Sequence, residues 1–424
     1  MRFPGLPVRL ILWKEITGSR ANQQVVYNDR KGEIIMRVPD VEWRARIAAA
    51  KQAGKAKGLD VLVLTAPENI YYYSGFRTML YTRFCCVAIP TDDGDPALVI
   101  PDLDLRLALG DWWSPTWFAA DRVKAYGPRE AVSDHMVFVH EFVKPGARIG
   151  IDAMSFVAYM GLEATIPGLK AVSVYDELNS LKQIKSESEV AALARANQIA
   201  SQGHENLKQY LTDRVKAGKE TTEIDIAMEM DRFARSQGSD GFGYPTLVSF
   251  GEKMLAPHSP ALNRQIPRDE IVRVAFGCAY EGYSGDVIRT YVIGKPSAVV
   301  EKLTKAYLEA QLACFDLIKP GVTNQDLVDL CTRIYTKHDV MAYWRGGIGH
   351  GLGMTIHEPP RLQTGAVGEL KQNMVIAVEP SLAGPDGSYA HCDVVRVTAT
   401  GCENLSPGMF DLVVIDGTRQ ALRA

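Results

Sequence analysis

The chain has 424 residues, which is enough for two or three globular domains. Apolar residues make up 46% of the chain and charged residues 23%, as in ordinary globular proteins. The net charge of −3 argues against nucleic acid or an acidic membrane surface as a partner. No apolar run approaches the roughly 18 residues that a membrane-spanning helix needs, so we expect no membrane contact.

The cysteine content predicts a reducing compartment. The chain has seven cysteines, an odd number, and no CxxC pair. We therefore expect free thiols and a cytoplasmic location. The N-terminal run from Val8 to Trp13 is too short and too interrupted to be the apolar core of a signal peptide.

The first part of the chain alternates short apolar runs with helical stretches. The runs at 61–64, 85–89 and 97–100 are typical of buried sheet strands, and 44–57 is typical of a helix. These elements predict an α/β domain over residues 1–178.

The second part, residues 179–424, predicts an α+β domain in which long helices cover a mixed sheet. Ser186 and Glu189 have the spacing of a capping box at the start of a long helix. Apolar residues from 300 to 317 recur at helical spacing, and Thr323 with Asp326 begins the next helix. The runs at 271–276, 287–293, 374–378 and 394–397 are typical of strands.

Four residues with reactive side chains stand in unusual positions in this second domain. Asp286 follows a glycine-rich hairpin, and His350 lies between Gly349 and Gly351. Glu379 ends an apolar strand, where a carboxylate is costly to bury without a metal or another cation. His258 lies in a proline-rich turn. Each residue alone also has an ordinary structural interpretation, but their order along the chain suits a divalent metal that activates water.

This ordered set resembles the creatinase/aminopeptidase P superfamily, whose catalytic domain has the pita-bread fold. The resemblance covers nearly the whole chain, and its most specific parts are 181–185, His258, 282–286, Arg289-Thr290, 350–358 and 378–380. It implies a pita-bread catalytic domain preceded by a smaller creatinase-type domain. It also implies a homodimer.

In metal-dependent members of this family, two Asp, one His and two Glu hold two divalent ions. Asp286, His350 and Glu379 match three of these ligands, but Ala275 falls at the first Asp. The last Glu falls on His391 or Cys392, depending on the spacing used. The resemblance therefore implies either no metal or one zinc, iron or manganese ion on the three matching residues, completed by His391 or Cys392. A dinuclear site is not expected.

Creatinase works without metal, and ectoine hydrolase has been described similarly; in both, the residue matching His258 is the general acid and base. This implies the catalytic candidates His258, His350, His357 and Glu379. The substrate-binding candidates are Arg83, Tyr283, Arg345 and His391. A guanidinium such as that of Arg83 pairs well with a carboxylate, although a solvated loop arginine is an equally good interpretation.

The preferred hypothesis is a hydrolase of a small non-peptide C–N bond (amide, amidine or guanidine) whose substrate carries a carboxylate. A metal-dependent Xaa-Pro aminopeptidase or dipeptidase is the main alternative. A lyase acting on a small organic acid and a non-catalytic binding protein also stay open. Ile288 stands where creatinase has a Glu, and 274–276 lacks the Glu of ectoine hydrolase, so neither known substrate carries over.

Overall fold

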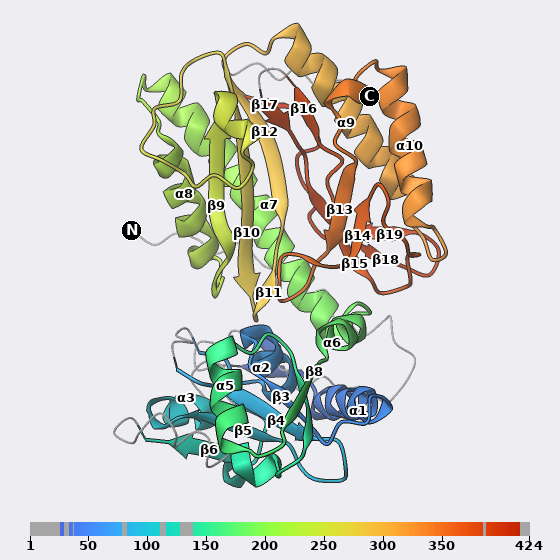
Figure 1. Ribbon diagram of the computed structural model, residues 1–424. Coiled ribbons are helices and arrows are strands. Elements are labelled where there is room, and N and C mark those ends of the chain that lie inside the picture. The colour runs from blue at the N-terminus through green and yellow to red at the C-terminus, as the bar shows by residue number, and fades with distance from the viewer. Residues whose placement is uncertain are drawn as a thin grey trace.

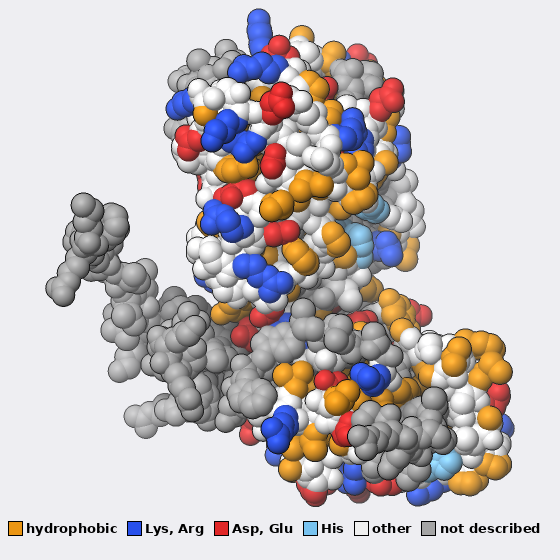
Figure 2. Space-filling view, turned by 90° about the vertical axis from the view of Figure 1, so that its left-hand side faces the viewer, with side chains coloured by type: hydrophobic (Ala, Val, Ile, Leu, Met, Phe, Trp, Pro, Cys, Tyr) orange, Lys and Arg blue, Asp and Glu red, His pale blue; other side chains and the backbone are white. Residues whose placement is uncertain are grey.

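The chain folds into two parts, shown in Figure 1 as a computed structural model. The structure describes residues 26–28, 34–36, 38–78, 83–110, 116–127, 139–384 and 387–415. Within these residues, no helix combines the length and the apolar character needed to cross a membrane. Figure 2 shows one face of the molecule, on which positive and negative side chains are intermixed.

The N-terminal part is built on a six-stranded mixed sheet of order β6-β5-β4-β3-β7-β8. The α/β architecture is as expected, and the three expected strands fall within a residue of β3, β4 and β5. Helix α1 begins at Asp40, four residues before its expected start, with Asp40 and Glu42 in a first turn where acidic residues suit the helix dipole. The strands are β3 (Val61–Leu64), β4 (Cys86–Pro90), β5 (Ala97–Pro101), β6 (Val123–Tyr126), β7 (Arg148–Ile151) and β8 (Lys170–Ser173). The helices are α1 (Asp40–Ala56), α2 (Pro67–Ser74), α3 (Leu105–Leu109), α5 (Phe156–Thr165) and α6 (Tyr175–Lys182), and a hairpin of β1 (Val26–Asn28) and β2 (Ile34–Met36) precedes them.

The C-terminal part contains two five-stranded sheets. The first has the order β11-β10-β12-β20, with β9 paired to β10, and the second has the order β14-β13-β15-β18-β19. The first sheet consists of β9 (Gly241–Phe250), β10 (Glu270–Tyr280), β11 (Tyr283–Ser284), β12 (Val287–Ile293) and β20 (Val413–Val414). The second consists of β13 (Gly347–Gly351), β14 (Glu358–Gln363), β15 (Val375–Val378), β18 (Asp393–Val397) and β19 (Cys402–Asn404); β16 (Leu382–Gly384) and β17 (Gly387–Tyr389) form a separate hairpin.

Two pairs of helices cover these sheets (Figure 1). Helices α7 (Glu187–Lys216) and α8 (Glu223–Ser236) pack on the first sheet, and α9 (Ala298–Leu317) and α10 (Asn324–Lys337) pack with the second. The capping boxes expected at Ser186 and Thr323 are both present, at the starts of α7 and α10. The two sheets meet where Ile288 of β12 and Cys392 exchange backbone hydrogen bonds of 3.3 and 3.1 Å. All seven cysteines are free thiols.

Polar contacts join the N-terminal part to the C-terminal part. The Arg77 guanidinium lies 2.9 Å from Asp240, and the Tyr71 hydroxyl donates to the Glu281 carbonyl at 3.0 Å. The expected boundary between residues 178 and 179 falls inside α6 and stays a prediction.

A buried ion pair joins Lys185, in the segment after α6, to Glu358 at the start of β14, with 2.7 Å between Nζ and Oε2. Burial raises the pKa of the Glu358 carboxyl, but Lys185 and Lys182 outweigh burial and leave that pKa below its usual value. The pair therefore stabilises the fold above the pKa of an unfolded Glu, about 4.3, and this contribution is lost as the pH falls through the lower folded-state value.

We expect Glu358→Gln to lower the free energy of unfolding by about 3–5 kcal/mol at neutral pH, because it leaves the Lys185 ammonium buried and unpaired. Urea unfolding at pH 7 and at pH 3–4 measures this loss, which should shrink at the lower pH. Glu177→Gln, which removes a half-exposed partner of Lys57, is the control and should cost under about 1 kcal/mol. Equal losses in the two variants would contradict the prediction.

Candidate active site

A cavity of about 660 Å³ lies where the two C-terminal sheets meet. Its volume is within the range of about 300–1,000 Å³ that is usual for small-molecule sites. The walls come from β9, β10, β12 and β13 and from the turns beside them. The cavity brings together six residues that the sequence singled out: His258, Asp286, Arg345, His350, His357 and Glu379.

Asp286 stands between β11 and β12, at the base of the cavity wall. Its backbone N–H donates to Asn197 Oδ1 at 2.9 Å, and the Tyr244 hydroxyl donates to its Oδ1 at 2.8 Å. Burial raises the pKa of the Asp286 carboxyl, while His350 and the bond from Tyr244 act in the opposite direction. Burial also raises the pKa of Tyr244, so this phenol stays protonated and acts as a donor.

His350 depends on the glycines beside it. A Cβ at Gly349 would clash with the Ala377 carbonyl oxygen, and one at Gly351 would clash with the Pro359 carbonyl oxygen. Glycine therefore lets β13 approach both neighbouring strands and directs the imidazole into the cavity. His350 Nδ1 lies 3.0 Å from the Gly351 carbonyl oxygen, which can only accept, so Nδ1 carries a proton.

The other nitrogen of His350 faces two carboxylates. Nε2 lies 3.5 Å from Asp286 Oδ2 and 3.6 Å from Glu379 Oε1. Burial and the nearby Asp286 charge raise the pKa of Glu379, which follows the end of β15. A carboxyl group whose pKa is raised toward neutral pH is suited to take a proton from water and return it.

Two further imidazoles line the cavity. The His357 ring stacks edge-on against His350, with 4.4 Å between ring centroids. Burial, His350 and His258 lower the pKa of His357 to about 4, so this ring is neutral at pH 7. His258 is an exposed residue of the cavity wall, in the turn after the 3-10 helix Gly251–Leu255.

Two substrate-binding candidates lie away from the cavity. The Tyr283 hydroxyl is buried and donates to Glu189 Oε1 at 3.1 Å. Arg83 is exposed on the N-terminal part, where its charge acts on Asp104. Neither residue lines the cavity of its own chain.

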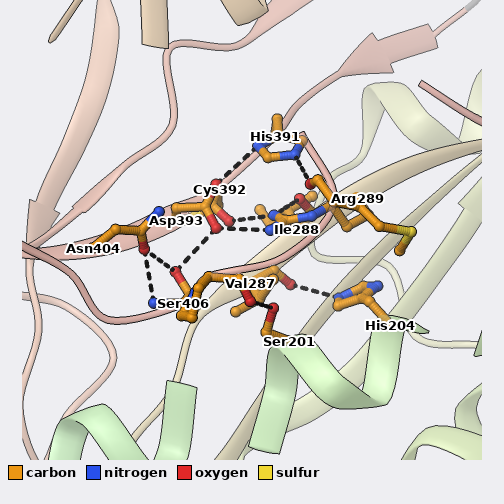
Figure 3. Close-up of polar contacts among 12 residues, drawn as sticks. Ser201, His204, Val287, Ile288, Arg289, His391, Cys392, Asp393, Asn404 and Ser406 are labelled. Carbon is orange, nitrogen blue, oxygen red and sulfur yellow. Dashed lines mark hydrogen bonds and ion pairs between the residues drawn. The ribbon is translucent and has the colours of Figure 1, made fainter. Parts of the chain in front are cut away.

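His391 belongs to a buried network beside the cavity (Figure 3). Its Nδ1 lies 3.1 Å from Asp393 Oδ2, and its Nε2 lies 2.9 Å from the Met409 carbonyl oxygen. Asp393 also accepts from Arg289 at 2.7 Å. Both ring nitrogens of His391 thus face protein groups, and His391 does not line the cavity.

Cys392 is the residue that lies beside Asp286. Its Sγ is 3.5 Å from the Asp286 carbonyl oxygen. Burial, followed by the charges of Asp286 and Glu379, raises the pKa of the Cys392 thiol well above its usual value, so the thiol is neutral. Of the two candidates for the last ligand position, His391 and Cys392, only Cys392 is close to the expected ligands.

Arg273 and Tyr244 also line the cavity, although neither was expected there from the sequence. Arg273 lines the cavity from β10 with only 7% of its surface exposed. A signal was present in the strand run 271–276, where Arg273 and Ala275 alternate with Val272, Val274 and Phe276 and so share one face of the sheet. A charged residue on the inner face of an apolar strand is unusual and marks a site.

Comparisons with known proteins define the family. Residues 46–184 match the Creatinase/Prolidase N-terminal domain, and residues 191–400 match Metallopeptidase family M24. These two domains span most of the chain, which belongs to the creatinase/aminopeptidase P superfamily with the pita-bread fold.

Several proteins with similar sequences are named as peptidases. The Xaa-Pro dipeptidase of Pyrococcus furiosus is 26% identical over 353 residues, covering 82% of this chain and 93% of that protein. The probable dipeptidase PepE of Mycobacterium tuberculosis is 27% identical over 386 residues, covering 88% and 96%. These names match the peptidase alternative rather than a non-peptide substrate, and they place the chain among hydrolases of C–N bonds.

Solved structures confirm the expected fold class. Dipeptidase PepE from Mycobacterium ulcerans superposes with a TM-score of 0.75 at 26% identity, covering 89% of this chain and 99% of that one. A prolidase from Thermococcus sibiricus superposes with a TM-score of 0.78 at 22% identity, covering 89% and 100%, and shows the fold alone.

The residues in the cavity differ from the ligand set of the metal-dependent relatives. Ala275, at the position expected for the first Asp, and the positively charged Arg273 line the cavity, and Cys392, whose thiol is neutral, lies beside Asp286. Within the described ranges, no three Asp, Glu, His or Cys side chains are arranged to hold a metal ion. Asp286, Glu379 and His350 supply two carboxylates and one imidazole, fewer ligands than the five that hold two ions in the metal-dependent relatives.

Proposed function

We propose that this protein hydrolyses the amide bond of a dipeptide-sized substrate that carries a carboxylate. The observation that carries the proposal is the gathering of His258, His350, His357, Asp286 and Glu379 around one cavity of about 660 Å³. Such a volume suits a small ligand and excludes a folded protein. The relatives named as dipeptidases favour a peptide over the non-peptide substrates that the sequence first suggested.

In the proposed mechanism, Glu379 accepts a proton from the water that attacks the substrate carbonyl. His350, whose Nε2 faces both Glu379 and Asp286, holds these two carboxylates in place. His258 donates a proton to the leaving nitrogen. The proposal needs no pair of metal ions, because Asp286 and Glu379 carry only two negative charges and Arg273 already offsets one of them.

Turnover of a substrate panel tests this proposal. The panel contains Xaa-Pro dipeptides, other dipeptides, and small amides, amidines and guanidines with a carboxylate, each with a strong chelator and with added manganese, cobalt, zinc or iron. We expect dipeptide cleavage that survives the chelator, with one oxygen from labelled water in the product. Cleavage of the non-peptide compounds alone would support the original hypothesis instead. Elimination products would indicate a lyase, and binding without turnover a binding protein.

Substitution of His258 tests its role as the proton donor. General acid–base groups contribute about 10²–10⁴-fold to rate, so His258→Ala should lower kcat by that factor. His140→Ala, in the N-terminal part, is the matched control and should leave kcat unchanged. Steady-state kinetics on the best dipeptide provides the measurement. An unchanged kcat in His258→Ala would remove this residue from the mechanism.

A further inference from the structure

We propose that Arg273 takes the place of the metal ions and binds the oxygen anion that forms on the attacked carbonyl. The inference rests on the proposed function, since it assigns the group that stabilises charge during the same amide hydrolysis. Its ligand class is a tetrahedral oxyanion, whether formed in the reaction or supplied by a stable mimic.

The position of Arg273 points to this role. Arg273 lies two residues before Ala275 on β10, so both side chains face the cavity. Ala275 occupies the expected position of the first metal-binding carboxylate, and its methyl side chain leaves more room in the cavity than an Asp side chain would. Asp286 and Glu379 line the same cavity as Arg273, so the guanidinium and the two remaining carboxylates belong to one site.

The small number of hydrogen bonds made by the Arg273 guanidinium also points to a role in binding a ligand. Its Nη1 has one long contact, 3.4 Å from the Pro257 carbonyl oxygen, and its Nε is buried without any hydrogen-bond partner. In the described part of the chain, Arg273 has no carboxylate within ion-pair distance. Burying a guanidinium with so few partners is unfavourable, and native structures keep such groups where a ligand completes them.

Arg289 provides an internal comparison. It is also buried and its Nε likewise has no hydrogen-bond partner, but its Nη atoms donate to Asp393 at 2.7 Å, to the Cys392 carbonyl at 2.8 Å and to the Ile288 carbonyl at 2.9 Å. Arg289 therefore has a structural role that its own partners explain. Arg273 has no equivalent set of partners and faces open space in the cavity.

The chemical step is balanced without a metal ion. The water oxygen forms a bond to the carbonyl carbon while Glu379 accepts the water proton. The carbonyl π electrons move to the oxygen, which becomes an anion that the Arg273 guanidinium binds. When the carbonyl re-forms, the C–N bond breaks and the electron pair leaves on nitrogen, which takes a proton from protonated His258. The products are a carboxylic acid and an amine, and Glu379 gives its proton to solvent while His258 takes one up, which restores both groups. Preorganised donors of this kind usually contribute about 10²–10³-fold to kcat.

The test uses a dipeptide analogue in which a phosphonate replaces the scissile amide, giving a stable tetrahedral anion. Calorimetry with chelator present compares the full-length protein with Arg273→Met and Arg273→Lys. We expect Arg273→Met to weaken phosphonate binding by about 10²–10³-fold and to lower kcat by a similar factor, with KM changed little. Arg273→Lys should restore part of both effects, because it returns the charge but not the planar donor geometry.

Stability separates this role from a structural one. Replacing a buried, poorly partnered charge with an apolar side chain of similar length is often neutral or stabilising, so Arg273→Met should melt at the same temperature or higher. A lower melting temperature with unchanged phosphonate affinity would overturn the proposal. Failure of the wild-type protein to bind the phosphonate would overturn it as well.

A triple variant tests directly whether the Arg273 guanidinium takes the place of the metal ions. Arg273→Met combined with Ala275→Asp and Cys392→Glu removes the guanidinium and supplies both lost carboxylates. We expect this variant to bind manganese or zinc at least about 10²-fold more tightly than wild type, measured by calorimetry and elemental analysis. Tight stoichiometric metal in the wild-type protein, with phosphonate binding abolished by chelator, would overturn the proposal. Phosphonate binding that depends on Arg273 without dipeptide turnover would reject only the proposed substrate.

Discussion

Arg289→Met is expected to lower the free energy of unfolding by about 3–5 kcal/mol, because it removes one partner of a buried ion pair. The side chains of Arg289 and Asp393 are almost fully buried, with 2.7 Å between Nη2 and Oδ1. Burial raises the pKa of Asp393, but Arg289 and His391 outweigh burial and lower it overall. Without Arg289, the Asp393 carboxylate loses its strongest partner inside the protein.

Urea unfolding followed by circular dichroism measures this effect. Arg273→Met is the matched control, since it makes the same change at a buried arginine that has few partners. The two variants should differ by several kcal/mol in the free energy of unfolding, with only Arg289→Met destabilised. If Arg289→Met were as stable as wild type, the network in Figure 3 would contribute little to the stability of the fold.

Glu379→Gln is expected to lower kcat by about 10²–10⁴-fold, because the amide keeps the shape of the side chain but cannot accept the proton of water. The variant should remain folded and at least as stable as wild type above neutral pH. Burial and Asp286 raise the pKa of Glu379, so its ionised form is disfavoured in the folded state, and removing that charge relieves a repulsion.

Initial rates on the best substrate and thermal melting at pH 8 measure the two effects of Glu379→Gln. Glu403→Gln, which changes an exposed carboxylate on β19, is the control and should affect neither quantity. A kcat within tenfold of wild type would exclude Glu379 as the general base. A large loss of stability would instead indicate a structural role.

Elements set by local chemistry could be predicted from the sequence. The capping boxes at Ser186 and Thr323 fix the starts of α7 and α10, because the side chain and the backbone N–H three residues later bond to each other. The run 287–293 gave the bounds of β12 without error, since turn residues limit an apolar stretch on both sides. The family resemblance identified the fold and six residues of the cavity.

Contacts between segments that are distant in the chain could not be predicted from the sequence. Neighbouring His391 and Cys392 differ in role because β18 begins just after them and turns alternate side chains to opposite sides. The sequence left both as possible ligands, whereas the structure places Cys392 beside Asp286 and His391 against Asp393 and the Met409 carbonyl.

The sequence by itself determined the starts of α7 and α10, the main strand runs, the family, and the lack of a carboxylate at Ala275 and at both His391 and Cys392. Only the tertiary structure showed that Arg273 lines the same cavity as Asp286 and Glu379. Arg273 lies between two apolar residues of β10, and only the three-dimensional surroundings leave its buried Nε without a hydrogen-bond partner. Whether a buried charge is satisfied is a property of its three-dimensional surroundings, which no local pattern specifies.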